Sequence, residues 1–296
     1  MGSSSQMKWS GKSRGGKFGH KFFIYITKIL GVRSAYCILA LVVVYFIPFA
    51  PKATKAVWKY NRQILGHGVL RSCRELYMHY FVFGQTLIDK MAIRAGLTDR
   101  YTFEFDNYKR FLEIIDGGEG VVLVGAHVGC WEAGSVFFGK YGKKINIVMY
   151  DAEYSQIKEV LKENDSQERD FKIIPVNQDG LTLMLQIKIA LDAGEYVCFN
   201  GDRYVDAGSS IEGKLLGKEA GFPSGPFVVA SRCRKPVAFY FAMREPGMKY
   251  RFIFHEPEIV PRMKPEELLG QYLRSLEQIL KAYPRQWFNF YDFWNK

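Results

Sequence analysis

Short apolar runs, each bounded by glycine or polar residues, recur through the second half of the chain and predict buried β-strands. The first of them is GVVLVGA at 120–126, in which no polar position interrupts the run. Five more follow, at 145–150, 171–176, 195–200, 236–243 and 250–256. Continuous runs like the first are typical of strands covered on both faces, as in a parallel sheet.

Helical periodicity fills intervals between these runs. Residues 179–193 begin with Asp179 as an N-cap and end at Gly194, which are the usual start and stop signals of a helix. Residues 264–282 carry seven apolar positions on one helical face. Strands that alternate with helices predict an α/β fold, with a mostly parallel sheet and helices on both faces.

The remaining stretches of the folded part contain no obvious domain boundary. Residues 53–115 have helical spacing with few breakers and predict a helical layer packed on the core. Residues 153–170 are polar and charged and predict an exposed helix and loop. Since no linker interrupts 53–296, we expect these residues to form one domain.

An uncharged apolar segment precedes this domain and predicts a helical membrane anchor over residues 21–52. The segment runs from Ala35 to Phe49, about 22 Å of helix, which is shorter than the roughly 30 Å hydrocarbon core of a bilayer. It can span only if Phe22–Ile26 contributes or the bilayer thins, so both a spanning and an in-plane helix stay open. Pro48 and Pro51 stand where a signal peptide would have its cleavage site, which favours an uncleaved anchor.

The net charge of +11 belongs to the N-terminal end and not to the fold. Residues 1–75 hold 13 Lys and Arg against one acid, Glu75, whereas the other 221 residues hold 28 basic and 29 acidic ones. Residues 1–20 form a basic tail, whose first six residues have the composition of a cloning remnant. Basic residues beside an apolar segment indicate anionic lipid head groups as the partner. Nucleic acid is excluded as the preferred partner, because it would favour basic residues on the folded domain.

The cysteines give no sign of a metal or a disulfide framework. All five are scattered, without a C-x-x-C pair or metal-ligand spacing: Cys37, Cys73, Cys130, Cys198 and Cys233. An odd, scattered set is typical of reduced core thiols in a cytoplasmic environment. We therefore predict no metal and no cofactor.

The stretch VLVGAHVGCWEAGS at 122–135 is the strongest candidate for chemistry. His127 follows a buried strand, at the edge of the sheet where ligands bind in α/β proteins. Glu132 lies five residues on, close enough to fix the tautomer of the imidazole and raise its basicity. Gly125 and Gly129 would let the backbone and a substrate approach closely. The alternative is a structural histidine, since His-x-x-x-x-Glu also occurs by chance.

Beyond this spacing, GAHVGCWEAG resembles the catalytic block of the bacterial late acyltransferases of lipid A synthesis, within the lysophospholipid acyltransferase superfamily. That block usually reads G-x-H-x-G-N-W-E, and here Cys130 replaces the asparagine. Residues 176–203 resemble the family's stretch that leads to an acidic motif at a strand end. Residues 221–244 resemble its Pro-Gly turn with the following helix and strand, and 283–294 resemble its closing Tyr-Pro-x-x-Trp segment.

The resemblance implies roles for individual residues. It makes His127 the general base and Glu132 its orienting partner, acting by direct transfer, and no Gly-x-Ser-x-Gly elbow suggests a covalent route. Arg203 is a candidate for binding the oxyanion, with Asp202 holding it or the acceptor. The alternative for Asp202 and Arg203 is a surface ion pair.

The resemblance also implies a substrate pocket. Its candidate residues are Gly125, Gly129, Trp131, Pro223, Ser224 and Gly225. For Ser224 and Gly225 the alternative is a simple helix start, with Pro226 at an early helical position. The aromatic cluster from Trp287 to Trp294 favours core or membrane interface over a substrate box.

The implied reaction moves a fatty acyl chain from a thioester donor, either acyl carrier protein or acyl-CoA, to a hydroxyl or amine of a lipid acceptor. The implied location is the bacterial cytoplasmic (inner) membrane, with the catalytic domain facing the cytoplasm. Cys130 and Arg203 depart from the family pattern and leave the acceptor open among a lipid A-like glycolipid, a lysophospholipid or other glycerolipid, an aminolipid and a polyene pigment precursor. A non-catalytic lipid-binding protein and a hydrolase are the alternatives from other classes.

Overall fold

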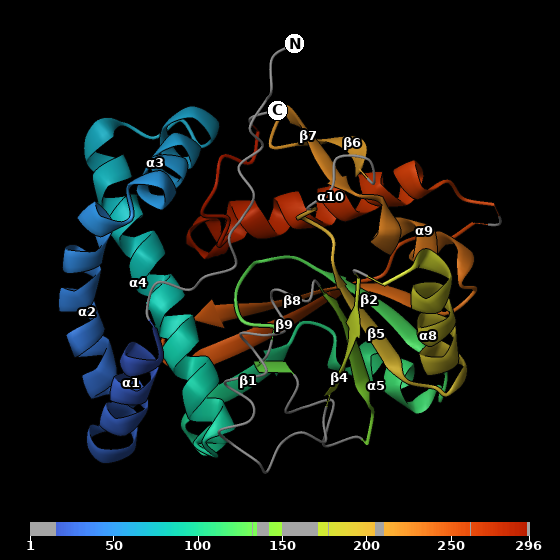
Figure 1. The fold of residues 1–296 in the computed structure, drawn as a ribbon, viewed down its shortest axis with the longest axis horizontal. Helices are drawn as coiled ribbons and strands as arrows, with labels where there is room; N and C mark the ends of the chain where they lie inside the picture. The colour runs from blue at the N-terminus through green and yellow to red at the C-terminus, as the bar shows by residue number, and fades with distance from the viewer. Residues whose placement is uncertain are drawn as a thin grey trace.

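A seven-stranded sheet forms the centre of the computed structural model, which describes residues 16–131, 133–134, 142–149, 171–176, 178–204, 210–260 and 262–294 (Figure 1). The strand order is β1-β9-β8-β2-β5-β3-β4. The strands are β1 (Thr102–Phe105), β2 (Val121–Gly125), β3 (Ile145–Met149), β4 (Phe171–Pro175), β5 (Tyr196–Asn200), β8 (Val237–Glu245) and β9 (Lys249–His255). All neighbours pair in parallel except β8 and β9, so the predicted mostly parallel sheet is confirmed.

Strand β2 shows why the predicted apolar runs fold this way. Its valines Val122 and Val124 point into one hydrophobic core, and Val121 and Leu123 point into the other. Because successive side chains of a strand face opposite sides, a strand between two cores must be apolar at every position. Helices therefore cover both faces of the sheet, as the sequence predicts.

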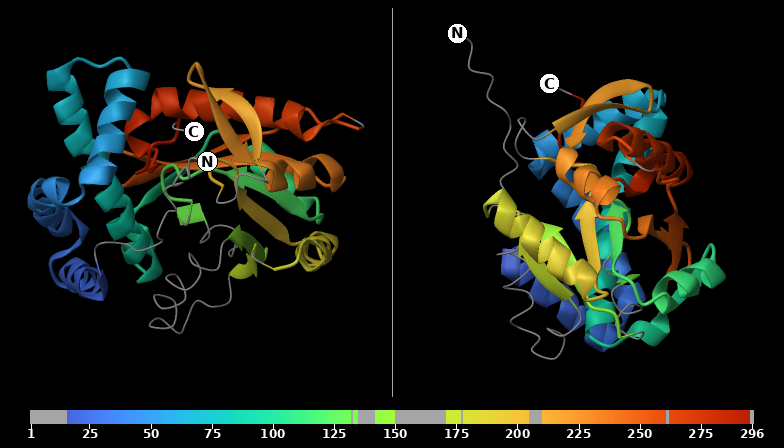
Figure 2. Two further views of the ribbon diagram at one scale, coloured as in Figure 1. Left: turned by 45° about the horizontal axis from the view of Figure 1, so that its top comes forward. Right: turned by 90° about the vertical axis from the view of Figure 1, so that its right-hand side faces the viewer.

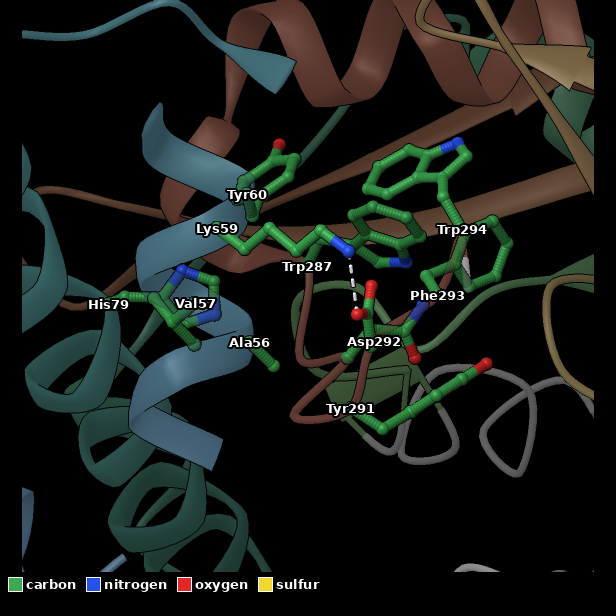
Figure 3. Close-up of a pocket in the computed structure, with 11 residues that line it drawn as sticks. Ala56, Val57, Lys59, Tyr60, His79, Trp287, Tyr291, Asp292, Phe293 and Trp294 are labelled. Carbon is green, nitrogen blue, oxygen red and sulfur yellow. Dashed lines mark hydrogen bonds and ion pairs between the residues drawn. The ribbon is translucent and has the colours of Figure 1, made fainter. Parts of the chain in front are cut away.

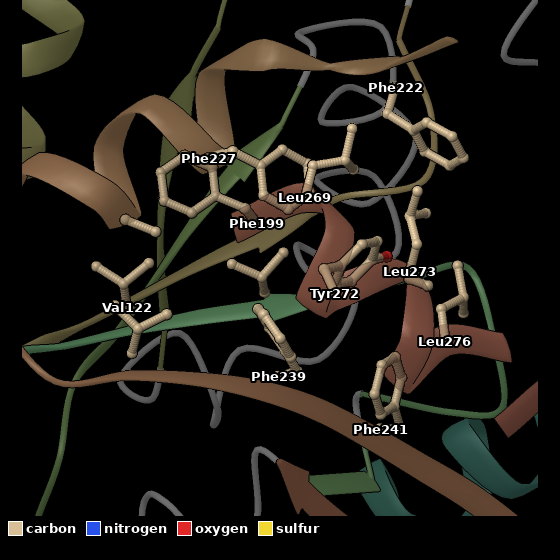
Figure 4. Close-up of a cluster of buried hydrophobic side chains, with 14 of the residues drawn as sticks. Val122, Phe199, Phe222, Phe227, Phe239, Phe241, Leu269, Tyr272, Leu273 and Leu276 are labelled. Carbon is tan, nitrogen blue, oxygen red and sulfur yellow. The ribbon is translucent and has the colours of Figure 1, made fainter. Parts of the chain in front are cut away.

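The helices on one face are α8 (Gly180–Asp192), α9 (Ser224–Arg232) and α10 (Pro265–Ala282). They pack against the sheet through the cluster of Figure 4, where Tyr272 of α10 lies among Phe227, Phe239 and Leu276. All seven predicted apolar residues of α10 are buried: Leu268, Leu269, Tyr272, Leu273, Leu276, Ile279 and Leu280. Asp179 caps α8 as predicted, since its side chain accepts a hydrogen bond of 3.0 Å from the Thr182 amide.

The other face carries the helical layer predicted for 53–115, but that stretch is not helical throughout. It holds α3 (Pro51–Lys59), the π-helical turn η1 (Tyr60–Ile64), α4 (Val69–Arg94), the 3-10 turn η2 (Thr98–Arg100), β1 and α5 (Tyr108–Asp116). Strand β1 was not predicted, because it is four residues long and lies at the sheet edge, paired only with the distant β9. The segment 153–170 lies outside the described residues.

A separate antiparallel hairpin, β6 (Ser210–Leu215) with β7 (Lys218–Pro223), also escaped prediction. Its two-residue turn places both Leu216 and Gly217 at positive φ, 51° and 81°. Tight hairpins require this conformation, but the usual sequence signal is Asn-Gly or Asp-Gly. Because leucine occupies the first turn position, the sequence lacks the usual signal for a hairpin.

The N-terminal helices α1 (Gly16–Leu30) and α2 (Val32–Phe49) pack beside α4, at one end of the molecule (Figure 1). Helix α2 has 18 residues and a mean hydropathy of 2.0, and by length and composition it could cross a membrane. Its inner face is buried through Val32, Ala35, Leu39 and Val43. The predicted boundary between an anchor at 21–52 and a domain at 53–296 stays a prediction.

A buried ionic cluster joins the helical layer to the sheet. Asp89 of α4 is fully buried. Its carboxylate accepts hydrogen bonds from Arg244 Nε of β8 at 2.8 Å, Tyr101 Oη at 2.9 Å and Tyr250 Oη of β9 at 2.6 Å. The Tyr36 hydroxyl of α2 donates to the same carboxylate. Residues of α2 and of the sheet therefore contact one buried carboxylate of α4, and this carboxylate links α2 to the sheet.

Candidate active site

His127 and Asp202 meet at the carboxyl edge of the sheet. His127 follows β2 and Asp202 follows β5, and these neighbouring parallel strands end opposite each other, with Gly125 paired to Asn200. His127 Nδ1 lies 2.7 Å from Asp202 Oδ1. The carboxyl edge is where α/β sheets place their ligand-binding groups. The fold thus joins two residues that are 75 positions apart in the chain.

The Asp202 carboxylate is fully buried and is surrounded by donors. The His127 backbone amide lies 3.1 Å from each of its oxygens, and the Trp287 indole N–H donates to Oδ2 at 3.1 Å. Burial alone would raise the pKa of Asp202, but the His127 ring, the charge of Arg203 and these hydrogen bonds outweigh it and lower the pKa to about 2. Asp202 is therefore ionised at neutral pH.

An ionised Asp202 fixes the state of the imidazole. Because a carboxylate only accepts hydrogen bonds, His127 Nδ1 must carry a proton, and in the neutral form of the ring Nε2 then holds the lone pair. Among the described residues, Nε2 has no hydrogen-bond partner. The side chain is 22% exposed, which leaves part of the ring open to a reactant.

The segment that carries His127 is held on both sides by backbone hydrogen bonds. The His127 carbonyl accepts from the Phe288 amide at 2.8 Å, and the Gly129 amide donates to the Gln286 carbonyl at 3.0 Å. On the other side, the Cys130 amide donates to the Ala242 carbonyl of β8 at 2.8 Å. The C-terminal segment and β8 together therefore fix the position of the histidine.

Gly129 is required by this arrangement, and we expect Gly129→Ala to destabilise the protein and lower its activity. Its φ of +57° is left-handed, and an added Cβ would lie 2.0 Å from the Ala242 carbonyl oxygen. Gly118→Ala is the matched control, because Gly118 has φ +70° but open space around it. We expect the control to cost about 1 kcal/mol of unfolding free energy and Gly129→Ala clearly more, read by thermal unfolding. Equal costs would show that the contact with Ala242 relaxes easily.

Arg203 lies beside the pair but is bound to the C-terminal segment. Its Nη2 donates to Asn289 Oδ1 at 2.8 Å, and its guanidinium lies 5.3 Å from the centre of the Tyr291 ring. The alternative of a surface ion pair between Asp202 and Arg203 is wrong, because Asp202 is fully buried and bonded to His127 and Trp287. The positive charge of Arg203 nevertheless lowers the pKa of Asp202.

The other predicted site residues are placed as follows. The Gly125 carbonyl accepts from the Tyr272 hydroxyl at 2.8 Å, and Trp131 is partly buried just after the held segment. Pro223 ends β7, and Ser224, Gly225 and Pro226 open α9, so the predicted helix start is confirmed, while a role of Pro223, Ser224 and Gly225 in a substrate pocket stays a prediction. Glu132 lies outside the described residues.

Trp287 is a site residue that the sequence did not single out. It is buried in the core, as one reading of the aromatic cluster predicts, but its indole N–H also orients Asp202. A tryptophan needs a partner for its N–H when it is buried. In the sequence, the only signal for a role of Trp287 at the site is its place in the closing Tyr-Pro-x-x-Trp segment.

Behind Trp287 a recess opens between the helical layer and the C-terminal segment (Figure 3). Lys59 Nζ and Asp292 Oδ2 form an ion pair of 2.7 Å there. The buried lining includes Tyr60 and His79, whose rings meet edge to face. Among the described residues, no group of three or more His, Cys, Asp or Glu could hold a metal ion.

His79 should make the stability of the protein depend on pH. Burial lowers the pKa of His79 to about 4, although the Trp287 backbone and Glu75 oppose the shift. Since the unfolded chain binds a proton near pH 6.5, stability is complete above that value and falls as the pH drops toward 4, by roughly 3 kcal/mol. We expect His79→Leu to flatten this part of the curve of thermal unfolding midpoint against pH. Identical curves for both proteins would contradict the assignment.

Comparison with known proteins identifies a family over the part of the chain that holds these residues. The family model of the bacterial lipid A biosynthesis acyltransferases matches residues 82–296, which include His127, Asp202 and Trp287. A search among curated proteins found no significant match. The match covers well over half of the chain and reaches from α4 to the C-terminal segment. The chain therefore belongs to the bacterial lipid A biosynthesis acyltransferase family.

Proposed function

We propose that the protein transfers a fatty acyl chain from a thioester donor to a hydroxyl or amine of a lipid acceptor, with His127 as the general base. The observation that carries this proposal is the 2.7 Å contact between His127 Nδ1 and the buried, ionised Asp202. It leaves Nε2 with the lone pair that a general base needs. Membership of the acyltransferase family supplies the reaction class.

In the proposed mechanism, Nε2 of His127 takes the proton from the acceptor as its oxygen or nitrogen attacks the thioester carbonyl. The new bond gives a tetrahedral intermediate, and its collapse breaks the carbon–sulfur bond. His127 returns its proton to the leaving thiolate, so protons balance over the cycle. Asp202 stays ionised throughout and stabilises the imidazolium, as the carboxylate does in serine hydrolases.

Sequence and geometry support different residues as the carboxylate that orients His127. The His-x-x-x-x-Glu spacing proposes Glu132, whereas the observed contact supports Asp202. Three donors hold Asp202 in place, so it is already positioned for this role. We therefore propose Asp202 as the positioning residue for His127, and keep Glu132 as a candidate for contact with the acceptor or donor.

Arg203 is the proposed group for the oxyanion. A guanidinium carries a fixed positive charge and five N–H donors, and a developing oxyanion is stabilised by such groups. Its place next to Asp202 in the chain keeps the positive charge at the same sheet edge as His127. Gly125, Gly129 and Trp131 are proposed to shape the entry to this edge.

Replacing Asp202 by asparagine should lower kcat by about 10²–10⁴-fold, because an amide can stabilise the wrong tautomer of His127 and cannot stabilise an imidazolium. The matched variant is Glu132→Gln, for which we expect a smaller loss in kcat. Rates would be measured with one donor and one acceptor over a range of pH. If Glu132→Gln lost more than Asp202→Asn at every pH, the orienting role would belong to Glu132.

The reaction itself is tested with detergent-solubilised, full-length protein and mass spectrometry of lipids. Acyl carrier protein and CoA thioesters are compared as donors, against a panel of glycolipid, lysophospholipid, aminolipid and polyene acceptors. An acylated product from one acceptor class supports the proposal and names the acceptor. Free fatty acid without any acylated lipid would instead establish a hydrolase, and the proposal would be wrong.

The family and the donor chemistry also support a location. Acyl carrier protein and CoA thioesters are cytoplasmic molecules, so we propose that the catalytic edge faces the cytoplasm at the inner membrane. The exposed basic residues around the N-terminal helices suit the anionic surface of that leaflet.

A further inference from the structure

Helix α2 lies along the folded domain and does not project from it. Its buried residues run from the first turn to the fourth, Val32, Ala35, Leu39 and Val43, and all face the helical layer. Gly84 of α4 allows a close approach, since a Cβ there would lie 2.5 Å from Leu39 Cδ1. The Tyr77 hydroxyl of α4 donates to the Ala40 carbonyl at 3.1 Å. Contact with α4 therefore extends along most of α2.

The charges on α4, the helix that α2 packs on, disfavour a position in hydrocarbon. Helix α4 carries the exposed Arg74 and the buried Glu75, which forms an ion pair of 2.5 Å with Arg285. Further along, Asp89 holds Tyr36 of α2 and Arg244 of the sheet in one cluster. A charge at the bilayer centre costs about 2.5–3.5 kcal/mol even by insertion scales. A spanning α2 that kept these contacts would carry α4 and the sheet edge into the bilayer.

The outer faces of α1 and α2 are nevertheless apolar and exposed. On α2 they include Leu41, which is 75% exposed, with Val44, Tyr45 and Phe49. On α1 they include Phe22, Tyr25, Ile29 and Leu30. Exposed lysines and arginines stand near the ends of these helices: Lys28, Arg33, Lys52 and Lys55. An exposed apolar surface that is flanked by basic residues fits the boundary between anionic head groups and acyl chains.

We infer that α1 and α2 lie in the plane of one leaflet and that the chain does not cross the bilayer. The occupant of their outer face is the lipid leaflet, and their inner face stays packed on α4. Length and hydropathy alone permit either arrangement, whereas the burial of the inner face and the shared Asp89 cluster favour this one. The inference does not depend on catalysis, and its test reads no activity.

The first test measures depth along the exposed face of α2 with spin labels. The positions are the native Cys37, Leu41→Cys and Tyr45→Cys, all exposed and one turn apart. Each label is studied in full-length protein in vesicles containing anionic lipid, with the other exposed cysteines changed to alanine. An in-plane helix gives three nearly equal depths from oxygen and nickel-chelate accessibility. A spanning helix would shift the depth by about 6 Å per step, at 1.5 Å per residue, and would overturn the inference.

The second test places both ends of the chain relative to the membrane. Ser4→Cys marks the N-terminal side of α1, and Ile259→Cys, 42% exposed beyond β9, marks the folded domain. A membrane-impermeant maleimide is applied to right-side-out and to inverted membrane vesicles, with the parent protein as background. The inference requires both cysteines to react from the same side. Reaction from opposite sides would establish a spanning α2.

Discussion

Replacing His127 by alanine should lower the rate of acyl transfer by about 10³-fold or more, while the fold stays intact. The imidazole is the proposed base, and its loss removes both proton transfer and the pre-organised pair with Asp202. The substitution leaves the backbone hydrogen bond to Phe288 in place, so the segment should keep its position. The measurement is initial rate with the donor and acceptor that the wild-type protein uses best.

The control for this variant is His67→Ala, because His67 lies in the connection between η1 and α4 and is only partly buried. We expect the control to keep its rate within about two-fold. Thermal unfolding in the same detergent checks that both variants are folded. If His127→Ala transferred acyl chains as fast as the control, His127 would be a structural residue and the general-base mechanism would be wrong.

The sequence predicted the strands well where burial is two-sided. In β2 every position faces a core, so the apolar run is continuous and its end at Gly125 is clear. The same reasoning predicts that His127 lies at the carboxyl edge of the sheet, just after β2. Strand β1 and the β6–β7 hairpin escaped prediction because their pairing depends on a distant strand or on a turn without its usual residues.

The contact between His127 and Asp202 could not be predicted from spacing along the chain. Spacing along the chain indicates Glu132, five residues after His127. Asp202 becomes a neighbour of His127 only when β2 and β5 pair in the sheet. The resemblance to the family implies another role for Asp202, which is to hold Arg203 or the acceptor. The hydrogen bond from Trp287 to Asp202 is likewise a long-range contact, made by the last segment of the chain. Such long-range contacts are decided by topology and not by local pattern.

The predicted membrane segment shows what hydropathy alone cannot predict about a helix. Hydropathy describes how apolar a helix is, and it does not say which neighbour covers which face. The segment Ala35–Phe49 therefore left a spanning and an in-plane helix open. Packing on α4 adds this information, since it covers Ala35, Leu39 and Val43 and leaves Leu41 and Tyr45 exposed, and the in-plane arrangement inferred above rests on it.

The cluster around Asp89 should give the largest loss of stability from a single substitution. Asp89→Leu leaves Arg244, itself only 9% exposed, without its counter-ion and leaves the hydroxyls of Tyr36, Tyr101 and Tyr250 without their acceptor. Removing one partner of a buried ion pair costs about 3–5 kcal/mol of unfolding free energy. Because the cluster joins α2 and α4 to the sheet, the loss should appear as a lower thermal unfolding midpoint of the whole protein.

Arg244→Met is the informative comparison, because it should cost clearly less. After that change, Asp89 still accepts hydrogen bonds from three tyrosine hydroxyls, so the carboxylate is not left unpaired. The double variant Asp89→Leu with Arg244→Met removes both charges and should recover part of the loss of Asp89→Leu. Thermal or denaturant unfolding in detergent measures all three. If Arg244→Met were as damaging as Asp89→Leu, the tyrosines would contribute little, and the ion pair alone would hold the helical layer to the sheet.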